Sequence, residues 1–403
     1  MTDATFPLVL PVQQEIRADS ISDVAGAVRR ELNAVGLRGR VKPGQRIAIT
    51  AGSRGFPYNV TVIRTIVEEL RKLGATAFIV PAMGSHGGAT AEGQRLMVES
   101  LGVTEATVGC PVISSMETVQ TGVTSSGVPV YCDRHAFQSD GIILFNRVKP
   151  HTAFRGKVES GLCKIATVGL GKQVGAEALH KAGLGPAIID AARINLHEAP
   201  VLGGIATVEN YREEPALIKG FPATEIIEGE AELLKVAWEY FPRLPFDDLD
   251  VLIVDRMGKE ISGTGMDVNV IGMHRRVGGA GKPDIRTIVC LDLTDASHGN
   301  ALGVGFADLV PRRLVDKIDR ATTYANVLTT GFYGTGKIPV TLPTPADCVV
   351  AALQPFDPGT IRLARIRDTK HLDRLWVSAA LRPLVEAHPA LKVIGPLEPL
   401  AVN

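Results

Sequence analysis

The segment SGLCKIATVGLGKQVGAEALH, residues 160–180, contains a lysine and a histidine that could both do chemistry. Lys164 has small and apolar neighbours, and His180 follows it sixteen positions later. On one straight helix the two residues would lie about 24 Å apart, and on one strand farther. If both serve one site, the chain has to turn between them, and the glycines of the interval permit a turn.

Three more side chains can take part in binding or catalysis. They are Arg54, His86 and His151, and each follows an apolar, strand-like run. The runs are RIAITAG, ATAFIVPAM and GIILFNRV. Taken singly, each residue has a structural explanation, such as shaping a turn or facing solvent. Parallel α/β sheets bind ligands at the carboxyl ends of their strands, so the joint placement at one sheet edge favours a site.

Strand-like and helix-like runs alternate from residue 46 onward, which predicts an α/β protein with mostly parallel sheets. Asn59 and Thr90 are predicted helix caps. FPRLPFDDLD (241–250) reads as a linker before a new apolar strand. We therefore expect two α/β domains, 1–245 and 246–403, with the active-site cleft between them. In the second domain, residues 306–320 and 371–386 are predicted to be helical.

Composition narrows the class of protein. Lys+Arg and Asp+Glu are equal at 43 each, which argues against a nucleic-acid partner and fits a small-molecule enzyme. The five cysteines are scattered without a C-x-x-C pair, which favours a reducing, cytoplasmic location over a disulfide framework. We see neither a signal peptide nor an apolar run long enough to span a membrane.

Several common motifs are absent or incomplete. VGLGK and GTGKIP lack the spacing of a phosphate-binding P-loop. The run GLGKQVG misses the dinucleotide fingerprint by one position. The chain has no G-x-S-x-G and no H-E-x-x-H motif. These gaps weigh against a nicotinamide enzyme, a serine hydrolase and a zinc protease.

The residues around Lys164 resemble the nickel-pincer-dependent lactate racemase family (LarA-type), and more closely its broader homologues. The family carries S-G-x-x-K, matched by Ser160, Gly161 and Lys164. The resemblance implies that this lysine tethers a nickel-pincer nucleotide, the nickel complex of pyridinium-3,5-bisthiocarboxylic acid mononucleotide. It also implies that His180 ligates the nickel and that His151 is a catalytic base.

The resemblance extends to the earlier loops. His86, in Gly-Ser-His, matches the second catalytic base, and Ser53-Arg54 matches a loop that meets the nucleotide phosphate and the substrate. The acidic residue expected three positions before the arginine is Ala51 here. The assisting lysine and glutamine of the second domain have no clear counterpart, and Lys259 is the provisional substitute.

The function implied is racemisation or epimerisation of a 2-hydroxy acid, which makes the protein an isomerase. Hydride leaves and returns to Cα through the cofactor, while a histidine on each side handles the hydroxyl proton. Expected partners are the small-molecule substrate and the cofactor-making enzymes, but neither nucleic acid nor membrane; a homo-oligomer is a possible assembly. Two alternatives stay open: a nicotinamide-dependent dehydrogenase, or a ligand-binding homologue without catalysis.

Overall fold

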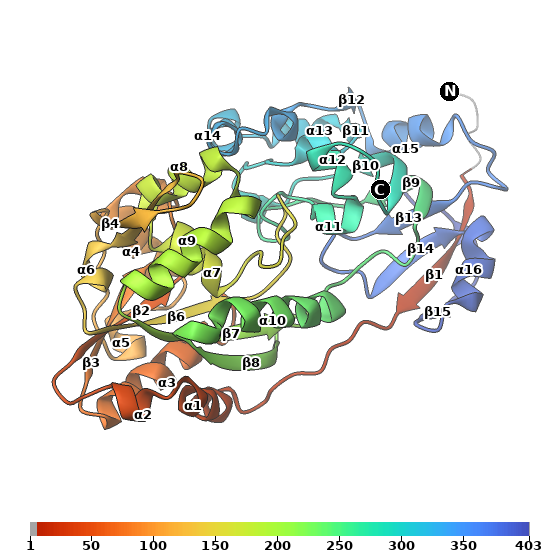
Figure 1. Cartoon of the computed structure of the whole chain (residues 1–403). Coiled ribbons are helices and arrows are strands. Elements are labelled where there is room, and N and C mark those ends of the chain that lie inside the picture. Colours follow the sequence, from red (N-terminus) through yellow and green to blue (C-terminus); the bar gives the residue numbers. More distant parts are fainter. Residues whose placement is uncertain (1–5, 403) are drawn as a thin grey trace. The chain divides into compact units, whose positions relative to one another are not determined.

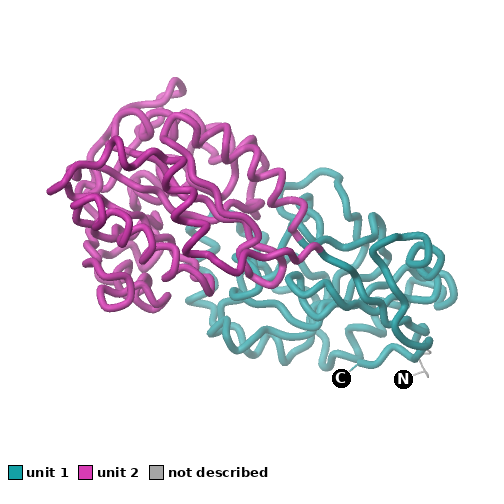
Figure 2. Tube along the Cα trace, turned by 90° about the horizontal axis from the view of Figure 1, so that it is seen from below, with its two compact units in different colours: residues 1–16, 242–403 teal, residues 17–241 magenta. Residues whose placement is uncertain are grey.

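The computed structural model describes residues 6–402, and these form two compact units (Figure 2). Unit 2 spans Arg17–Phe241, and unit 1 joins the described part of residues 1–16 to the chain from Pro242 onward. The passage at Phe241–Pro242 lies in the predicted linker. The predicted first domain also included the N-terminal strand, and here the structure differs. Strand β1 (Leu8–Gln14) pairs with β14 (Arg374–Ser378), so the strand belongs to the sheet of the C-terminal half.

The sheet of unit 2 has the strand order β3-β2-β6-β7-β8 (Figure 1). The pairs β2–β3, β2–β6 and β6–β7 are parallel, and β7–β8 is antiparallel. A separate antiparallel hairpin joins β4 to β5. The strands are β2 (Arg46–Ala51), β3 (Thr76–Pro81), β4 (Thr118–Val123), β5 (Pro129–Asp133), β6 (Gly141–Arg147), β7 (Val201–Glu209) and β8 (Pro215–Pro222).

Both faces of this sheet are buried, as expected for parallel strands. Ile47 and Ile49 of β2 face one hydrophobic core, whereas Ala48 faces the other, because successive side chains of a strand alternate. Helices cover both faces. They are α1 (Val24–Val35), α2 (Leu37–Arg40), α3 (Asn59–Lys72), α4 (Ala91–Ser100), α5 (Glu105–Val108), α6 (Arg134–Phe137), α7 (Leu162–Lys164), α8 (Lys172–Ala182), α9 (Leu184–Glu198) and α10 (Ile226–Tyr240).

One of the two predicted helix caps is correct. The Thr90 side chain accepts a hydrogen bond from the Gly93 N–H and caps α4. Asn59 instead is the first residue of α3 and is buried, and Tyr58 occupies the cap position without a side-chain hydrogen bond. Packing of Asn59 against the core therefore overrides its capping preference.

The sheet of unit 1 has the strand order β12-β11-β10-β9-β13-β14-β1-β15, and β16 pairs with β1. It is parallel from β12 to β13 and antiparallel beyond, so both units contain a mixed sheet and the α/β class is confirmed. The remaining strands are β9 (Asp248–Val254), β10 (Asp284–Cys290), β11 (Leu309–Pro311), β12 (Val340–Leu342), β13 (Leu363–Ile366), β15 (Leu391–Val393) and β16 (Glu398–Pro399). The helices are α11 (Val268–Ile271), α12 (His274–Val277), α13 (Arg312–Asp316), α14 (Arg320–Thr330), α15 (Pro345–Leu353) and α16 (Arg382–Ala387).

Two helices predicted in the second domain are largely wrong. Residues 306–320 contain β11 and the short α13, and residues 371–386 begin with β14 before α16. Leu375 and Val377 of β14 are fully buried and lie opposite Val12 and Leu10 of β1. Pairing with a strand from the other end of the chain thus decided the conformation there.

Two further features bear on the class of protein. Within residues 6–402, the helices are too short or too polar for any of them to cross a bilayer. The five cysteines are buried free thiols.

Candidate active site

The predicted residues of unit 2 follow the carboxyl ends of three neighbouring strands. Ser53 and Arg54 follow β2, His86 follows β3, and His151 follows β6. In the parallel register, Ala51 lies opposite Pro81 and Ile49 lies opposite Ile143, so the three loops leave the sheet at one edge. This is the placement predicted from the sequence.

His86 is held in a glycine-rich turn and contacts the loop after β2. Its Nδ1 atom lies 2.5 Å from the Ser53 hydroxyl oxygen. Gly84 and Gly87 adopt φ values of +61° and +66°, which favour glycine. The buried Gln94 amide donates to the carbonyls of Gly84 and His86, at 2.7 and 3.3 Å. Ser53 therefore orients His86, a role that the sequence did not indicate.

His151 is held differently, in a partly buried loop with a carboxylate behind it. Its backbone N–H donates to Glu159 at 2.5 Å, and its Nδ1 accepts the Ala153 N–H at 3.0 Å. The imidazole packs against the Phe154 ring, with 4.5 Å between centroids. Its Nε2 atom lies 2.7 Å from the Lys164 amine nitrogen. The predicted base, His151, and the predicted tether, Lys164, are therefore in contact.

Positive charges surround Lys164. Burial, together with the nearby positive charges of Lys149 and Arg54, lowers the pKa of Lys164 to about 8. The Arg54 side chain keeps part of its surface in solvent, yet the protein around its guanidinium lowers its pKa, and Arg147 adds to the effect. Arg147 forms an ion pair with Glu209. This edge of the sheet is therefore suited to an anion such as a phosphate or a carboxylate.

Ser160 and Gly161, predicted to bind the cofactor, have clear structural tasks. The backbone of Ser160 pairs with that of Lys149, which closes the loop that carries His151. The Gly161 carbonyl accepts a hydrogen bond from the Asn146 amide at 2.8 Å. A Cβ atom at Gly161 would lie 2.3 Å from the carboxyl carbon of Glu230, so only glycine fits. Their contact with a cofactor stays a prediction.

Glu230 of α10 supports the segment that carries Lys164. It is fully buried, and its carboxylate accepts the Cys163 N–H at 2.7 Å, at the N-terminal end of the helical segment. Burial raises the pKa of Glu230 to about 7, although the N–H donors partly oppose the shift. A residue some seventy positions away thus positions the lysine.

The chain bends between Lys164 and His180, as required, but the glycines do not make the bend. A π-helical turn at Ile165–Gly169 follows α7, and Lys172 then takes a φ of +52°. Gly171 has a φ of −69°, and glycine is needed there because a Cβ would lie 2.5 Å from the Thr167 carbonyl oxygen. This geometry is not a strand-to-helix turn, so GLGKQVG does not form a dinucleotide-binding loop.

Lys172 is fully buried and stabilises the bend. Its amine lies 3.1 Å from the Asp133 carboxylate and 3.2 Å from the Gln94 amide oxygen, and it also donates to the Pro81 carbonyl. The lysine of VGLGK therefore forms a buried, structural ion pair and is not available to bind a phosphate. Through Gln94 it also supports the His86 turn.

His180 lies on the exposed last turn of α8. A Cβ built on Gly84, in the His86 turn, would lie 3.2 Å from the Ala176 Cβ. Residues four apart share a helix face, so His180 lies one turn beyond this contact. Among residues 6–402, no three histidine, cysteine or acidic side chains gather into a metal site. A shared cleft for His180 and Lys164 stays a prediction.

Lys259 belongs to unit 1, in the loop after β9. Its amine donates to the Gly263 carbonyl at 2.6 Å, and its backbone N–H donates to the Ser297 hydroxyl at 2.9 Å. A role for Lys259 beside residues of unit 2 stays a prediction.

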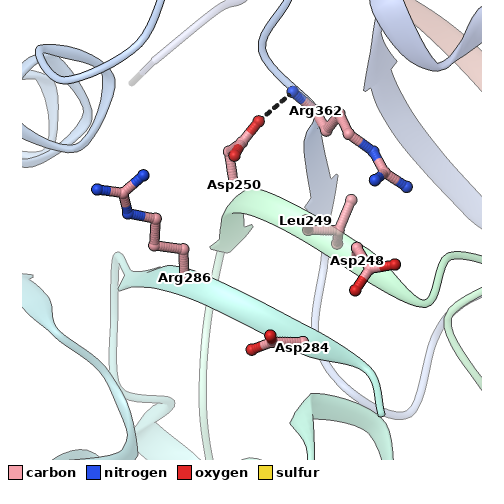
Figure 3. Close-up of a pocket in the computed structure, with 6 residues that line it drawn as sticks. All are labelled: Asp248, Leu249, Asp250, Asp284, Arg286 and Arg362. Carbon is pink, nitrogen blue, oxygen red and sulfur yellow. Dashed lines mark hydrogen bonds between the residues drawn. The ribbon is translucent and has the colours of Figure 1, made fainter.

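A hollow of about 300 Å³ in unit 1 lies away from the strand ends at which a ligand is expected (Figure 3). It lies at the amino ends of β9 and β10, opposite to the strand ends at which ligands of parallel sheets bind. Asp250 accepts the Arg362 N–H at 2.8 Å and so ties the β9 start to β13. Its lining residues are Asp248, Leu249, Asp250, Asp284, Arg286 and Arg362.

Sequence reasoning missed the residues that support the site from behind. Arg147 and Lys149 could have been found, because they flank the end of β6 just before His151. Glu159 is an acidic residue beside the S-G-x-x-K motif, which was a weak signal. Glu230 and Gln94 lie inside helical patterns, where nothing local distinguishes them from surface residues.

Part of the sequence and the fold are similar to those of known proteins. Residues 3–184 match the family model described as the lactate racemase N-terminal domain. No curated protein matches the sequence. The lactate racemase apoprotein from Thermoanaerobacterium thermosaccharolyticum is similar in structure, with a TM-score of 0.56 at 13% identity, over 90% of this chain and 98% of that one. A structural-genomics target protein from Thermotoga maritima has a TM-score of 0.50 at 13% identity, over 69% and 72% of the two chains. At such identities the likeness concerns the fold alone.

Proposed function

Since residues 3–184 of this chain belong to the lactate racemase N-terminal domain family, we propose that the protein is a racemase or epimerase of a 2-hydroxy acid. The observation that carries the proposal is the gathering of the predicted residues at one sheet edge. His86 contacts Ser53, the residue before Arg54, and His151 contacts Lys164. The charge of Arg54 acts on Lys164 and so links the two contacts. This supports a cationic site with a histidine on each side of the substrate.

The residues fit a tethered, anionic cofactor of the nickel-pincer nucleotide type. Arg54 and Lys149 are exposed cations at this edge, and they would bind a phosphate or a carboxylate. Lys164 would carry the covalent bond, and His180 would supply an imidazole to the nickel. When bound, the cofactor supplies reversible acceptance of a hydride from the substrate Cα.

The chain itself manages the protons. A histidine on one side takes the proton of the substrate hydroxyl, and the histidine on the other side returns one to the opposite face. His86 and His151 suit this task because an imidazole titrates near neutral pH. Lys259 of unit 1 would assist by binding the substrate. We place the activity in the cytoplasm, where buried thiols stay reduced, with the cofactor-making enzymes as partners and a possible homo-oligomer.

The test is to co-express the chain with cofactor-making enzymes and to analyse the purified protein. We expect a mass increase on Lys164, bound nickel, and interconversion of the enantiomers of at least one 2-hydroxy acid. Lys164→Ala should abolish all three. Lys157→Ala is a matched control, because Lys157 is an exposed lysine paired with Glu228.

Two results would contradict the proposal. Bound NAD without nickel would favour the dehydrogenase alternative. A full nickel and cofactor load without turnover of any 2-hydroxy acid would favour the silent ligand-binding alternative.

A further inference from the structure

The contact between His151 and Lys164 determines where the protons are. The Ala153 N–H donates to Nδ1 of His151 at 3.0 Å, so Nδ1 carries a lone pair. In a neutral imidazole the proton is then on Nε2. This Nε2–H points at the Lys164 nitrogen, 2.7 Å away. The amine has to accept that hydrogen bond, which only a neutral amine can do.

The surroundings favour the same state. Lys149 and Arg54 are the charged groups that act on the amine, and both disfavour an ammonium ion. Burial acts in the same direction. The nearby carboxylates of Glu159 and Glu230 bind the backbone N–H groups of His151 and Cys163. Among residues 6–402, Lys164 forms no ion pair with a carboxylate that would restore its charge.

We propose that His151 holds Lys164 as a neutral, nucleophilic amine before any cofactor binds, so that Lys164 is the lysine of this chain best prepared for acylation. In such a step the nitrogen lone pair bonds to the acyl carbon, the leaving group departs with the bonding electrons, and the surplus amine proton passes to solvent. His151 is a positioning residue here, since its Nε2 already carries a proton. The use of this neutral amine for cofactor attachment rests on the proposed function, whereas the test of its protonation state does not.

The experiment uses the full chain without cofactor and a limiting amount of the N-hydroxysuccinimide ester of acetic acid, between pH 6 and pH 10. Peptide mass spectrometry would follow acetylation of Lys164 and of the exposed reference lysines Lys72 and Lys235. We expect the Lys164 rate to level off near pH 8, while the references still rise at pH 10. At pH 7.5 the excess for Lys164 should be on the order of ten- to a hundredfold, since each pKa unit changes the amine fraction about tenfold.

Two variants separate the role of His151 from general burial. His151→Phe keeps a ring against Phe154 but removes the donor, and should move the Lys164 profile at least about one unit higher. His197→Phe, at an exposed histidine, should change nothing. A Lys164 profile that coincides with the references, or that is the same in wild type and His151→Phe, would overturn the inference.

A second measurement covers the case in which the reagent fails to reach Lys164. Nitrogen-15 spectra of histidine-labelled protein at pH 7 report the tautomer directly, with the His151 signals assigned from His151→Phe. We expect the Nε2–H tautomer. An Nδ1–H tautomer or an imidazolium would refute the proposal. Neither readout requires nickel or turnover, so this inference and the proposed function can fail separately.

Discussion

The turn that carries His86 and the loop that carries His151 leave the same sheet edge but are built differently. The His86 turn uses positive φ values at Gly84 and Gly87, and its histidine is exposed beside the Ser53 hydroxyl. The His151 loop is closed by backbone pairing and anchored on the buried Glu159. The first histidine thus lies beside a hydroxyl in a glycine-rich turn, and the second lies in a loop held by a buried carboxylate.

The difference shows that two bases with equivalent chemistry need not have equivalent environments. His86 is exposed, so its ring can exchange protons with solvent. In the chain without cofactor, Nδ1 of His151 accepts the Ala153 N–H, which keeps the proton on Nε2 beside Lys164. We therefore expect changes near His151 to affect both cofactor attachment and stability, and changes near His86 to affect proton transfer alone.

The largest expected effect comes from removing either histidine. His86→Ala and His151→Ala should each lower racemisation by about 10²–10⁴-fold, the usual contribution of a positioned general base. With an enantiopure substrate, each variant should keep a half-reaction from one antipode only, measured as isotope exchange or 2-oxo acid formation. His151→Ala should in addition reduce the cofactor mass on Lys164. Equal, mild losses for both antipodes would remove the two-base assignment.

A second prediction uses the pH dependence of stability beneath Lys164. Because the pKa of Glu230 is raised to about 7 in the folded protein from 4.5, the unfolded chain loses this proton first as the pH rises. Stability should therefore fall between about pH 4.5 and pH 7, by about 3 kcal/mol from this residue. Glu230→Gln does not titrate and should show a flatter dependence in urea unfolding. Parallel curves for the two proteins would show that Glu230 is ionised throughout.

A third prediction concerns the anchor of the His151 loop. Glu159→Ala leaves the His151 N–H without its acceptor and should lower the free energy of unfolding by about 1–3 kcal/mol. Glu228→Ala, at an exposed position, is the control and should change it by less than about 1 kcal/mol. Denaturant unfolding of both variants measures the difference. If the two were equally stable, the loop would not depend on Glu159.

The smallest effect is expected at Ser53. Ser53→Ala removes a hydrogen bond worth about 0.5–1.5 kcal/mol, so racemisation should fall about three- to tenfold. Ser53→Thr keeps the hydroxyl and should retain most activity. Loss of cofactor from Ser53→Ala, measured by intact mass, would instead support the phosphate-binding role predicted from the sequence.

Parts of the molecule could be predicted because their signals are local. The apolar runs before Arg54, His86 and His151 indicated buried parallel strands, and capable side chains directly after such runs have to lie at the sheet edge. Thr90 could be identified as a cap from its side chain and position alone. The helix predicted over residues 371–386 failed because β1, from the other end of the chain, pairs with β14.

The order of residues along the chain is enough to predict which side chains follow which strands, and hence that Arg54, His86 and His151 share one sheet edge. Which buried residues support these side chains depends on the three-dimensional packing. Glu230 lies against Gly161, and Lys172 binds Asp133 at the bend before α8. The proton positions of His151 and Lys164 were decided in the same way. The physical reason is that strand periodicity acts between neighbours in the chain, whereas a buried charge or a tautomer depends on every group that packing brings around it.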